Sequence, residues 1–155
     1  MGRLEMYTDQ IVLADDDPDH GLLFKVILRQ IDPLKQLLVL CNGNELIDYL
    51  SVRKPCLLFL DLHMPCKNGY ECLDEIRQYP HLKSLPVVVY SSSSQMPDIK
   101  RSFIHKADLY LVKPFNSFHL RNALESILKM DWLKNSTNVK YYFMNNRFVP
   151  FTAEA

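Results

Sequence analysis

The chain has 155 residues, of which 48% are hydrophobic and 23% are charged, a composition that is ordinary for one globular domain with a short extension. Its 18 basic residues equal its 18 acidic residues, so the overall charge does not favour nucleic acid or an anionic membrane as a partner. No apolar run approaches the ~20 residues that are needed to span a bilayer.

The four cysteines form no CxxC pair, and their spacing argues against a zinc site. Since we find no signal peptide, we expect free thiols in a reducing, cytoplasmic environment. The cysteines are Cys41, Cys56, Cys66 and Cys72.

Short apolar runs alternate with amphipathic segments along residues 10–130. The runs predict strands at residues 10–14, 37–41, 56–60, 86–90 and 109–112. Runs without alternating polar residues are typical of strands that are buried on both faces of a parallel sheet. The intervening segments predict helices at about residues 18–31, 45–52, 70–79, 97–106 and 117–130. Strict alternation of five strands with five helices implies right-handed crossovers and a three-layer α/β sandwich.

Capping residues mark where several of these helices begin. Asp17 before Pro18 suits the start of the first helix, Asn44 that of the second, and Asn116 or Ser117 that of the last. The helix at 97–106 has a weak amphipathic pattern, so we expect it to be the least firmly held.

The two ends of the chain lie outside this alternation. We expect residues 1–9 to be an N-terminal extension, residues 10–130 to be the domain, and residues 131–155 to be a tail too short for a second domain. Two interpretations of the tail stay open: an extension that packs on the domain or is partly disordered, or a contact surface for a dimer or another partner. The second rests on the tail's aromatic residues, which are Trp132, Tyr141, Tyr142, Phe143, Phe148 and Phe151.

Polar residues directly follow four of the five predicted strands. The carboxyl ends of parallel strands lie at one edge of a sheet, where open α/β sheets bind their ligands, so we expect these side chains to converge. They are Asp15, Asp16, Asp61, Ser91, Ser92 and Lys113.

This set of side chains suits phosphoryl chemistry. Three neighbouring carboxylates repel one another unless a cation lies among them, and hard oxygen ligands suit Mg²⁺. A carboxylate beside such an ion can attack a phosphoryl group, as an aspartate does in some ATPases. Asp61 would be this nucleophile, while Lys113 and Ser91 supply the positive charge and hydrogen bonds that the transition state needs.

Five segments, in order and at strand ends, resemble the CheY-like receiver domain of response regulators in two-component signalling. They are IVLADDD (11–17), LDLHMP (60–65), NGY (68–70), VYSS (89–92) and YLVKPF (110–115). The resemblance spans residues 10–130 and implies a flavodoxin-like sandwich with a five-stranded parallel sheet of order 2-1-3-4-5.

The resemblance also implies the roles of the acidic residues. Asp61 corresponds to the residue that accepts the phosphoryl group. Asp16, Asp61 and the backbone carbonyl of His63 correspond to ligands of a Mg²⁺ or Mn²⁺ ion, and Asp15 to an acid that holds this ion through water.

Further roles follow from the same resemblance. Lys113, Ser91 and the backbone amide of Ser92 would bind the phosphoryl group. Ser91 and Tyr110 would form the switch, with Tyr110 swinging inward when the serine hydroxyl turns toward the phosphoryl group. The Lys113–Pro114 peptide bond is expected to be cis.

Several positions depart from the family pattern. Ser91 replaces the commoner threonine but keeps a hydroxyl, and Lys106 stands where the family often has glycine. His63 and Ser93 would flank the attacking water, and neither has a carboxylate or amide to orient it. We therefore expect slow to moderate self-dephosphorylation. The other histidines show no ligand spacing and are expected at the surface; they are His20, His81, His105 and His119.

We therefore expect a stand-alone response regulator that is not an enzyme acting on outside substrates. It would receive its phosphoryl group from a sensor histidine kinase or phosphotransfer protein. It would signal to a downstream protein through its fourth helix, fifth strand and fifth helix, as a monomer or a phosphorylation-dependent dimer. Two alternatives stay open: a Mg²⁺-dependent phosphohydrolase, in which His63 stands where a second acid is usual, and a constitutive pseudo-receiver scaffold, for which an acid or the lysine should be missing.

Overall fold

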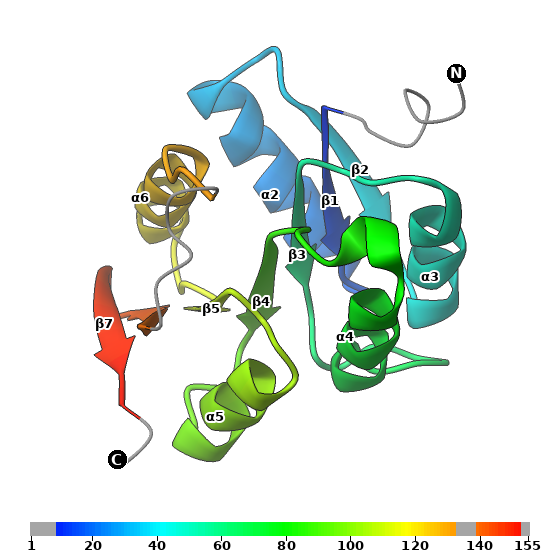
Figure 1. Ribbon diagram of the computed structural model, residues 1–155. Coiled ribbons are helices and arrows are strands. Elements are labelled where there is room, and N and C mark those ends of the chain that lie inside the picture. Colours follow the sequence, from blue (N-terminus) through cyan, green and yellow to red (C-terminus); the bar gives the residue numbers. More distant parts are fainter. Residues whose placement is uncertain (1–8, 133–138, 153–155) are drawn as a thin grey trace.

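The computed structural model describes residues 9–132 and 139–152. Its strands form one seven-stranded sheet in the order β2-β1-β3-β4-β5-β6-β7 (Figure 1). The strands are β1 (Gln10–Ala14), β2 (Gln36–Leu40), β3 (Leu57–Leu60), β4 (Val87–Ser91), β5 (Leu109–Val112), β6 (Lys140–Met144) and β7 (Arg147–Phe151).

The first five strands pair in parallel in the order 2-1-3-4-5, which confirms the predicted flavodoxin-like core. β3 and β4 are buried at every residue, as expected for central strands without polar alternation. The predicted strand boundaries differ from the observed ones by no more than one residue.

Helices cover both faces of the sheet, which gives the three predicted layers (Figure 1). α2 and α6 lie on one face, where Phe24 and Leu124 belong to one buried apolar cluster. α3, α4 and α5 cover the other face, where Leu46, Leu73 and Ile99 belong to a second cluster. The helices are α2 (Pro18–Ile31), α3 (Gly43–Val52), α4 (Gly69–Gln78), the short 3₁₀ helix η1 (Pro80–Leu82), α5 (Met96–Ile104) and α6 (Ser117–Leu128). Within the described residues, no helix is both long and apolar enough to cross a bilayer.

Side-chain caps explain where four of these helices begin. Asp17 caps α2 ahead of Pro18, and Asn116 caps α6, as predicted. α3 is capped by Asn42 instead of the predicted Asn44, because the extended backbone at Asn42 lets its side chain accept from the Glu45 N–H. α5 begins after Gln95 without a side-chain cap.

The count of five strands was too low, because the described part of the tail adds β6 and β7. β6 pairs in parallel with β5, and β7 folds back on β6 as an antiparallel hairpin. Asn145 and Asn146 form the two-residue turn with φ angles of 54° and 62°, as in the type I′ turns that suit hairpins. Asparagine accepts this left-handed conformation more readily than most residues. Residues 1–8, 133–138 and 153–155 lie outside the described chain, so most of the expected N-terminal extension does as well.

Candidate functional site

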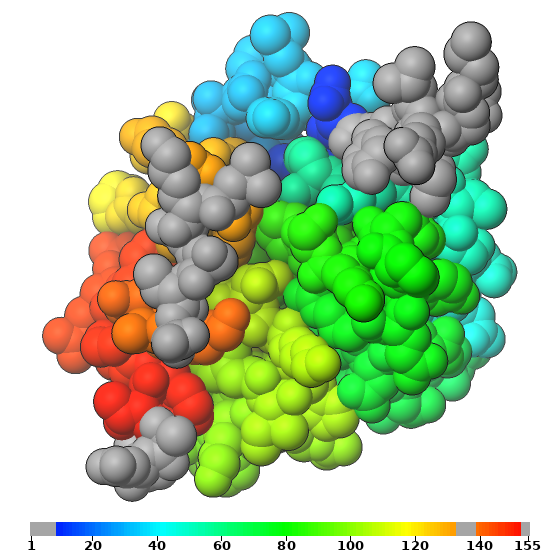
Figure 2. All heavy atoms as spheres, viewed as in Figure 1, coloured from blue at the N-terminus to red at the C-terminus, as the bar shows by residue number. Residues whose placement is uncertain are grey.

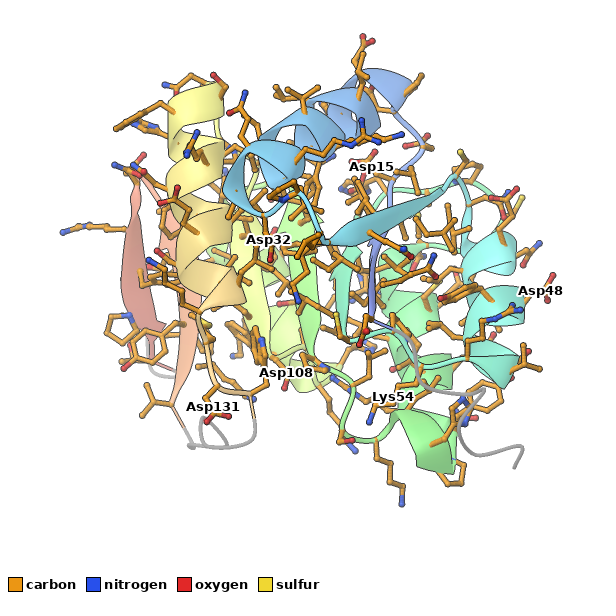
Figure 3. The ribbon with its side chains drawn as sticks, turned by 90° about the horizontal axis from the view of Figure 1, so that it is seen from above. Asp15, Asp32, Asp48, Lys54, Asp108 and Asp131 are labelled. Carbon is orange, nitrogen blue, oxygen red and sulfur yellow. The ribbon has the colours of Figure 1, made fainter. Side chains whose placement is uncertain are left out.

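The candidate site lies at the carboxyl ends of β1 and β3, which are neighbours in the sheet. The Asp15 N–H donates to the carbonyl of Leu40 at 3.0 Å, and the Asp61 N–H donates to that of Ala14 at 2.9 Å. These bonds place both aspartates immediately beyond paired strands. Figure 3 shows Asp15 at one edge of the sheet, away from Asp108 and Asp131 at the opposite edge.

Three carboxylates meet at this edge, as predicted. Asp15, Asp16 and Asp61 can each offer one oxygen such that all three oxygens lie within 4.8 Å of one another. Asp15 is 1% exposed and Asp61 5% exposed, whereas Asp16 is exposed. Two buried acids and one accessible acid form a cluster, which we call the carboxylate cup, with the Asp16 side chain exposed to solvent.

These residues fit a divalent cation. Asp15 Oδ1 accepts from the Asp17 N–H at 2.9 Å, but Oδ2 is buried and has no aligned hydrogen-bond donor among the described residues. Lys113 Nζ lies 2.9 Å from this oxygen and forms an ion pair without hydrogen-bond alignment. Three carboxylates face one ammonium group, so a divalent cation would balance the remaining charge, and oxygen ligands suit Mg²⁺ or Mn²⁺.

Lys113 connects the two buried acids. Its Nζ lies 3.2 Å from Asp61 Oδ2 as well as 2.9 Å from Asp15 Oδ2, and it stands 5.2 Å from the centre of the Tyr90 ring. The Lys113 N–H donates to the carbonyl of Ser91 at 2.7 Å, which fixes the lysine at the end of β5. The sequence therefore correctly placed this cation beside the acids.

Burial raises the pKa of the Asp61 carboxyl above its ordinary value, and the charge of Asp15 raises it further. The Lys113 ammonium and the backbone N–H of His63 lower the pKa of Asp61, but they do not offset the loss of water. A buried carboxylate that is short of solvation is a reactive oxygen base, which suits a nucleophile.

The loop after Asp61 is held against the site by backbone contacts. The His63 N–H donates to Asp61 Oδ1 at 3.2 Å, while the His63 side chain is exposed. Gly69 packs so closely that a Cβ there would lie 2.6 Å from the Asp61 carbonyl oxygen. Asn68 and Glu71 form a reciprocal capping box that starts α4 at this point.

The two predicted switch residues are both buried. Ser91 is buried at the end of β4, and its hydroxyl accepts from the Ser93 N–H at 3.2 Å. Tyr110 is 0% exposed, and its hydroxyl donates to the Ser93 carbonyl at 2.9 Å. Ser92 is exposed in the bend that follows β4.

The expected cis bond between Lys113 and Pro114 is absent: the described peptide bonds are all trans. Lys113 reaches both Asp15 and Asp61 with the trans bond, so this geometry does not require the cis form. The trans form of a bond before proline is also favoured by about 0.5–1 kcal/mol.

His20 is the site residue that sequence analysis missed, because it was expected to be an ordinary surface residue. Its Nδ1 lies 3.0 Å from Lys113 Nζ and 3.3 Å from Asp15 Oδ2, and its Nε2 lies 3.5 Å from Asp17 Oδ2. The spacing of three residues from Asp17 to His20 on one helix was the available signal. Its proximity to Lys113 is a long-range side-chain contact, which periodicity does not reveal.

Two other histidines also make specific contacts. His81 Nε2 lies 2.8 Å from the Leu50 carbonyl oxygen, and His105 Nδ1 lies 2.6 Å from Asp74 Oδ1. His81 of η1 thus contacts α3, and His105 at the end of α5 contacts α4.

Comparison with known proteins agrees with this fold and site. Residues 11–125 match the model of the response regulator receiver domain. Response regulator Rcp1 of Synechocystis is 31% identical over 82% of this chain and 90% of its own length. The probable methanogenesis regulatory protein FilR2 of Methanothrix harundinacea is 29% identical over 79% of this chain and 83% of its own length.

Solved structures of the same class superpose well on the chain. The Mn²⁺-bound form of Rcp1 has a TM-score of 0.70 at 30% identity, covering 84% of this chain and 98% of that one. The phosphorylated cyanobacterial phytochrome response regulator RcpA has a TM-score of 0.72 at 29% identity, covering 83% and 96%. The chain belongs to the response regulator receiver family, and its class is that of two-component signalling proteins.

Proposed function

We propose that Asp61 accepts a phosphoryl group from a phosphohistidine of a sensor kinase or phosphotransfer protein. A carboxylate oxygen of Asp61 forms the new O–P bond while the P–N bond of the donor breaks, and the imidazole leaves with its electron pair. The observation that carries this proposal is the Lys113 ammonium group between Asp61 and Asp15. That cation lies where negative charge on the transferred group would develop.

The remaining parts of the site have matching roles. We infer that Asp16, Asp61 and the His63 carbonyl bind Mg²⁺ or Mn²⁺ directly and that Asp15 holds it through water, consistent with three carboxylate oxygens within 4.8 Å of one another. A bound divalent ion would reduce the repulsion between Asp61 and the incoming phosphoryl oxygens. Lys113, the Ser91 hydroxyl and the Ser92 amide would bind the transferred group.

Three exposed apolar side chains close in sequence to site residues support a protein as the donor. Leu22 and Phe118 are each 65% exposed, and Phe115 is fully exposed. Phe115 and Phe118 lie two and five residues after Lys113, and Leu22 lies two residues after His20 in α2. Exposed apolar side chains around a polar site are typical of a protein contact, and we propose that the kinase or phosphotransfer protein binds there.

We propose that residues 10–130 are the receiver domain and that Ser91 and Tyr110 transmit its phosphorylation state. A downstream protein would then bind α5, β5 and α6, with the protein acting in the cytoplasm as a monomer or a phosphorylation-dependent dimer. All four cysteines are unpaired, which is compatible with a reducing compartment. No turnover of outside substrates is proposed, since His63 provides no second acid beside Asp61.

Self-dephosphorylation should be slow to moderate. The Ser93 hydroxyl donates to Asp98 Oδ2 at 2.5 Å and accepts from the Gln95 N–H, so it is occupied away from an attacking water. We expect His63→Asn, which offers an amide at the other flanking position, to shorten the half-life of the phosphoryl group severalfold. Decay of acetyl-phosphate-labelled protein measures this half-life. Equal half-lives in wild type and His63→Asn would show that the residue at position 63 does not control self-dephosphorylation.

The central experiment treats the full chain with acetyl phosphate and with beryllofluoride, each with Mg²⁺. Mass spectrometry should detect one phosphoryl group, ¹⁹F NMR should detect a protein-bound beryllofluoride signal, and Asp61→Asn should abolish both. If neither adduct forms on wild type, or Asp61→Asn still forms them, the proposed function is wrong and the scaffold alternative gains support.

A further inference from the structure

The β6–β7 hairpin covers the strand that carries the switch tyrosine. In a five-stranded receiver sheet β5 would be the edge, but here Tyr110 is opposite Tyr142 in the parallel pair of β5 and β6. Residues opposite each other on adjacent strands project to the same face. Tyr142 therefore stands beside Tyr110 on the face covered by α5, and it is only 7% exposed.

β7 lies on the side of β6 that faces away from β5, and it packs against the same apolar cluster. Val149 and Phe151 pack against the apolar cluster that contains Tyr110 and Tyr142. The Phe151 ring lies 5.1 Å from the ring of Phe103 on α5. The hairpin thus connects to α5 through a ring contact as well as to β5 through the sheet.

The other face of the hairpin contacts α6. Phe143 is buried in the cluster shared with α6, and its ring packs edge-to-face on Phe148 at 4.9 Å. The Asn122 side chain of α6 donates to Asn146 Oδ1 in the hairpin turn at 3.2 Å. Figure 1 shows the hairpin beside β5 with α6 and α5 on either side, and Figure 2 shows its atoms against both helices.

The free edge of β7 is poorly suited to further strand pairing. In a hairpin with a two-residue turn, the pair next to the turn is hydrogen-bonded and the pairs then alternate. Pro150, opposite Tyr141, falls in a non-hydrogen-bonded pair, so its nitrogen faces the outer edge and offers no N–H there. Proline at this place is a common protection of edge strands, and it indicates that the hairpin ends the sheet.

These contacts have a consequence for Tyr110. An aromatic side chain on an edge strand can turn outward into solvent, whereas Tyr142 and the contact between Phe151 and Phe103 fill the space beside β5. We propose that the β6–β7 hairpin is an intramolecular lock that keeps Tyr110 buried in the unphosphorylated protein. The inference rests on the proposed function and refines it: in this chain Tyr110 would already hold its inward position, so that phosphorylation would be sensed through Ser91 with Tyr110 in place. A downstream partner of the α5–β5–α6 region would then contact the hairpin, since β5 is not at the edge.

The test compares the full-length wild type with two variants. Phe151→Ala removes the hairpin ring that packs against α5. Phe103→Ala removes the opposite ring on α5 and leaves the hairpin sequence intact. Tyr141→Ala is the matched control, because this aromatic residue lies on β6 but is 41% exposed. NMR signals of the Tyr110 ring are followed with a soluble gadolinium relaxation agent, with and without beryllofluoride and Mg²⁺.

We expect the wild-type and Tyr141→Ala rings of Tyr110 to be protected in both states. Phe151→Ala and Phe103→Ala should show a severalfold rise in solvent relaxation of this ring without beryllofluoride, and protection should return with it. Hydrogen exchange at β1 and β3 amides verifies that each variant is folded, and Phe151→Leu replaces Phe151→Ala if that variant unfolds.

An exposed Tyr110 ring in free wild type, or unchanged protection in both ring variants, would overturn the lock. The readout without beryllofluoride does not depend on Asp61 chemistry. If no adduct forms, the proposed function fails, while protection of Tyr110 by the hairpin can still be measured.

Discussion

At the scale of single residues, the site depends on a conflict between burial and charge. Asp61 and Asp15 are almost completely buried next to each other, and one Lys113 ammonium serves both carboxylates. The pKa of Asp61 is raised because the loss of water outweighs this ion pair. Reactivity and instability therefore have the same physical origin at this position.

The raised pKa predicts that ionised Asp61 opposes folding. The folded state binds the Asp61 proton more tightly than the unfolded state, whose carboxyl has an ordinary pKa of 3.8. The destabilisation is thus absent below this value, grows as the pH rises toward the folded-state pKa, and is complete above it. Asp61→Asn should raise the free energy of unfolding of the metal-free protein at pH 7 by on the order of 1 kcal/mol.

Urea unfolding from pH 4 to pH 8 measures this effect. The gain from Asp61→Asn should shrink as the pH approaches 4, and Asp48→Asn should show little change, since Figure 3 places Asp48 on the outer side of α3. A less stable Asp61→Asn variant at pH 7, with an unchanged denaturant slope, would contradict the prediction.

At the scale of elements, the site depends on how closely α4 approaches the loop after β3. A Cβ on Gly69 would lie 2.6 Å from the Asp61 carbonyl oxygen and 2.8 Å from Leu62 Cα. These are backbone atoms of the loop that carries the nucleophile, so they cannot yield without moving it.

Gly69→Ala should therefore destabilise the protein by about 1–3 kcal/mol and weaken beryllofluoride binding by displacing the loop. Gly21→Ala is the matched control, because a Cβ there would meet only the Val39 side chain, at ordinary distances of 3.4 Å to Cγ1 and 3.7 Å to Cγ2. In the interior of α2 this change should stabilise by about 0.5–1 kcal/mol. Thermal and urea unfolding of both variants test the pair, and equal effects would show that the close approach at Gly69 does not matter.

At the scale of the whole molecule, the seven-stranded sheet brings together segments that are distant in the sequence. The cup combines the ends of β1, β3 and β5 with the first turn of α2, and the hairpin ties the tail to α5 and α6. Binding at the cup should therefore stabilise the entire fold, since the site exists only in the folded state.

Mg²⁺ at one hundred times its dissociation constant should raise the free energy of unfolding by about 2.7 kcal/mol. Asp16→Ala should remove most of this gain and leave metal-free stability nearly unchanged, because the Asp16 side chain is exposed. Unfolding with Mg²⁺ and with a chelator measures both quantities. A gain that persists in Asp16→Ala would place the ion elsewhere.

The sequence by itself determined the parallel core and the acid–lysine cup. Apolar runs that are followed by a polar residue are local patterns. Parallel pairing places the carboxyl ends of such strands at one edge of the sheet, independently of the loop conformations. Asp15, Asp61 and Lys113 followed from this rule alone.

The tertiary structure decided what depends on contacts between distant segments. The Asn145–Asn146 turn between two aromatic stretches was a local hairpin signal that the sequence analysis missed. Pairing of this hairpin with β5 is a long-range choice that no local period encodes. His20 and Lys113 meet because the two side chains extend over the same carboxyl end of the sheet. Lys113–Pro114 is trans, and the lysine reaches both acids in that form. Local patterns specify elements and strand ends, whereas neighbours across the fold are selected by packing.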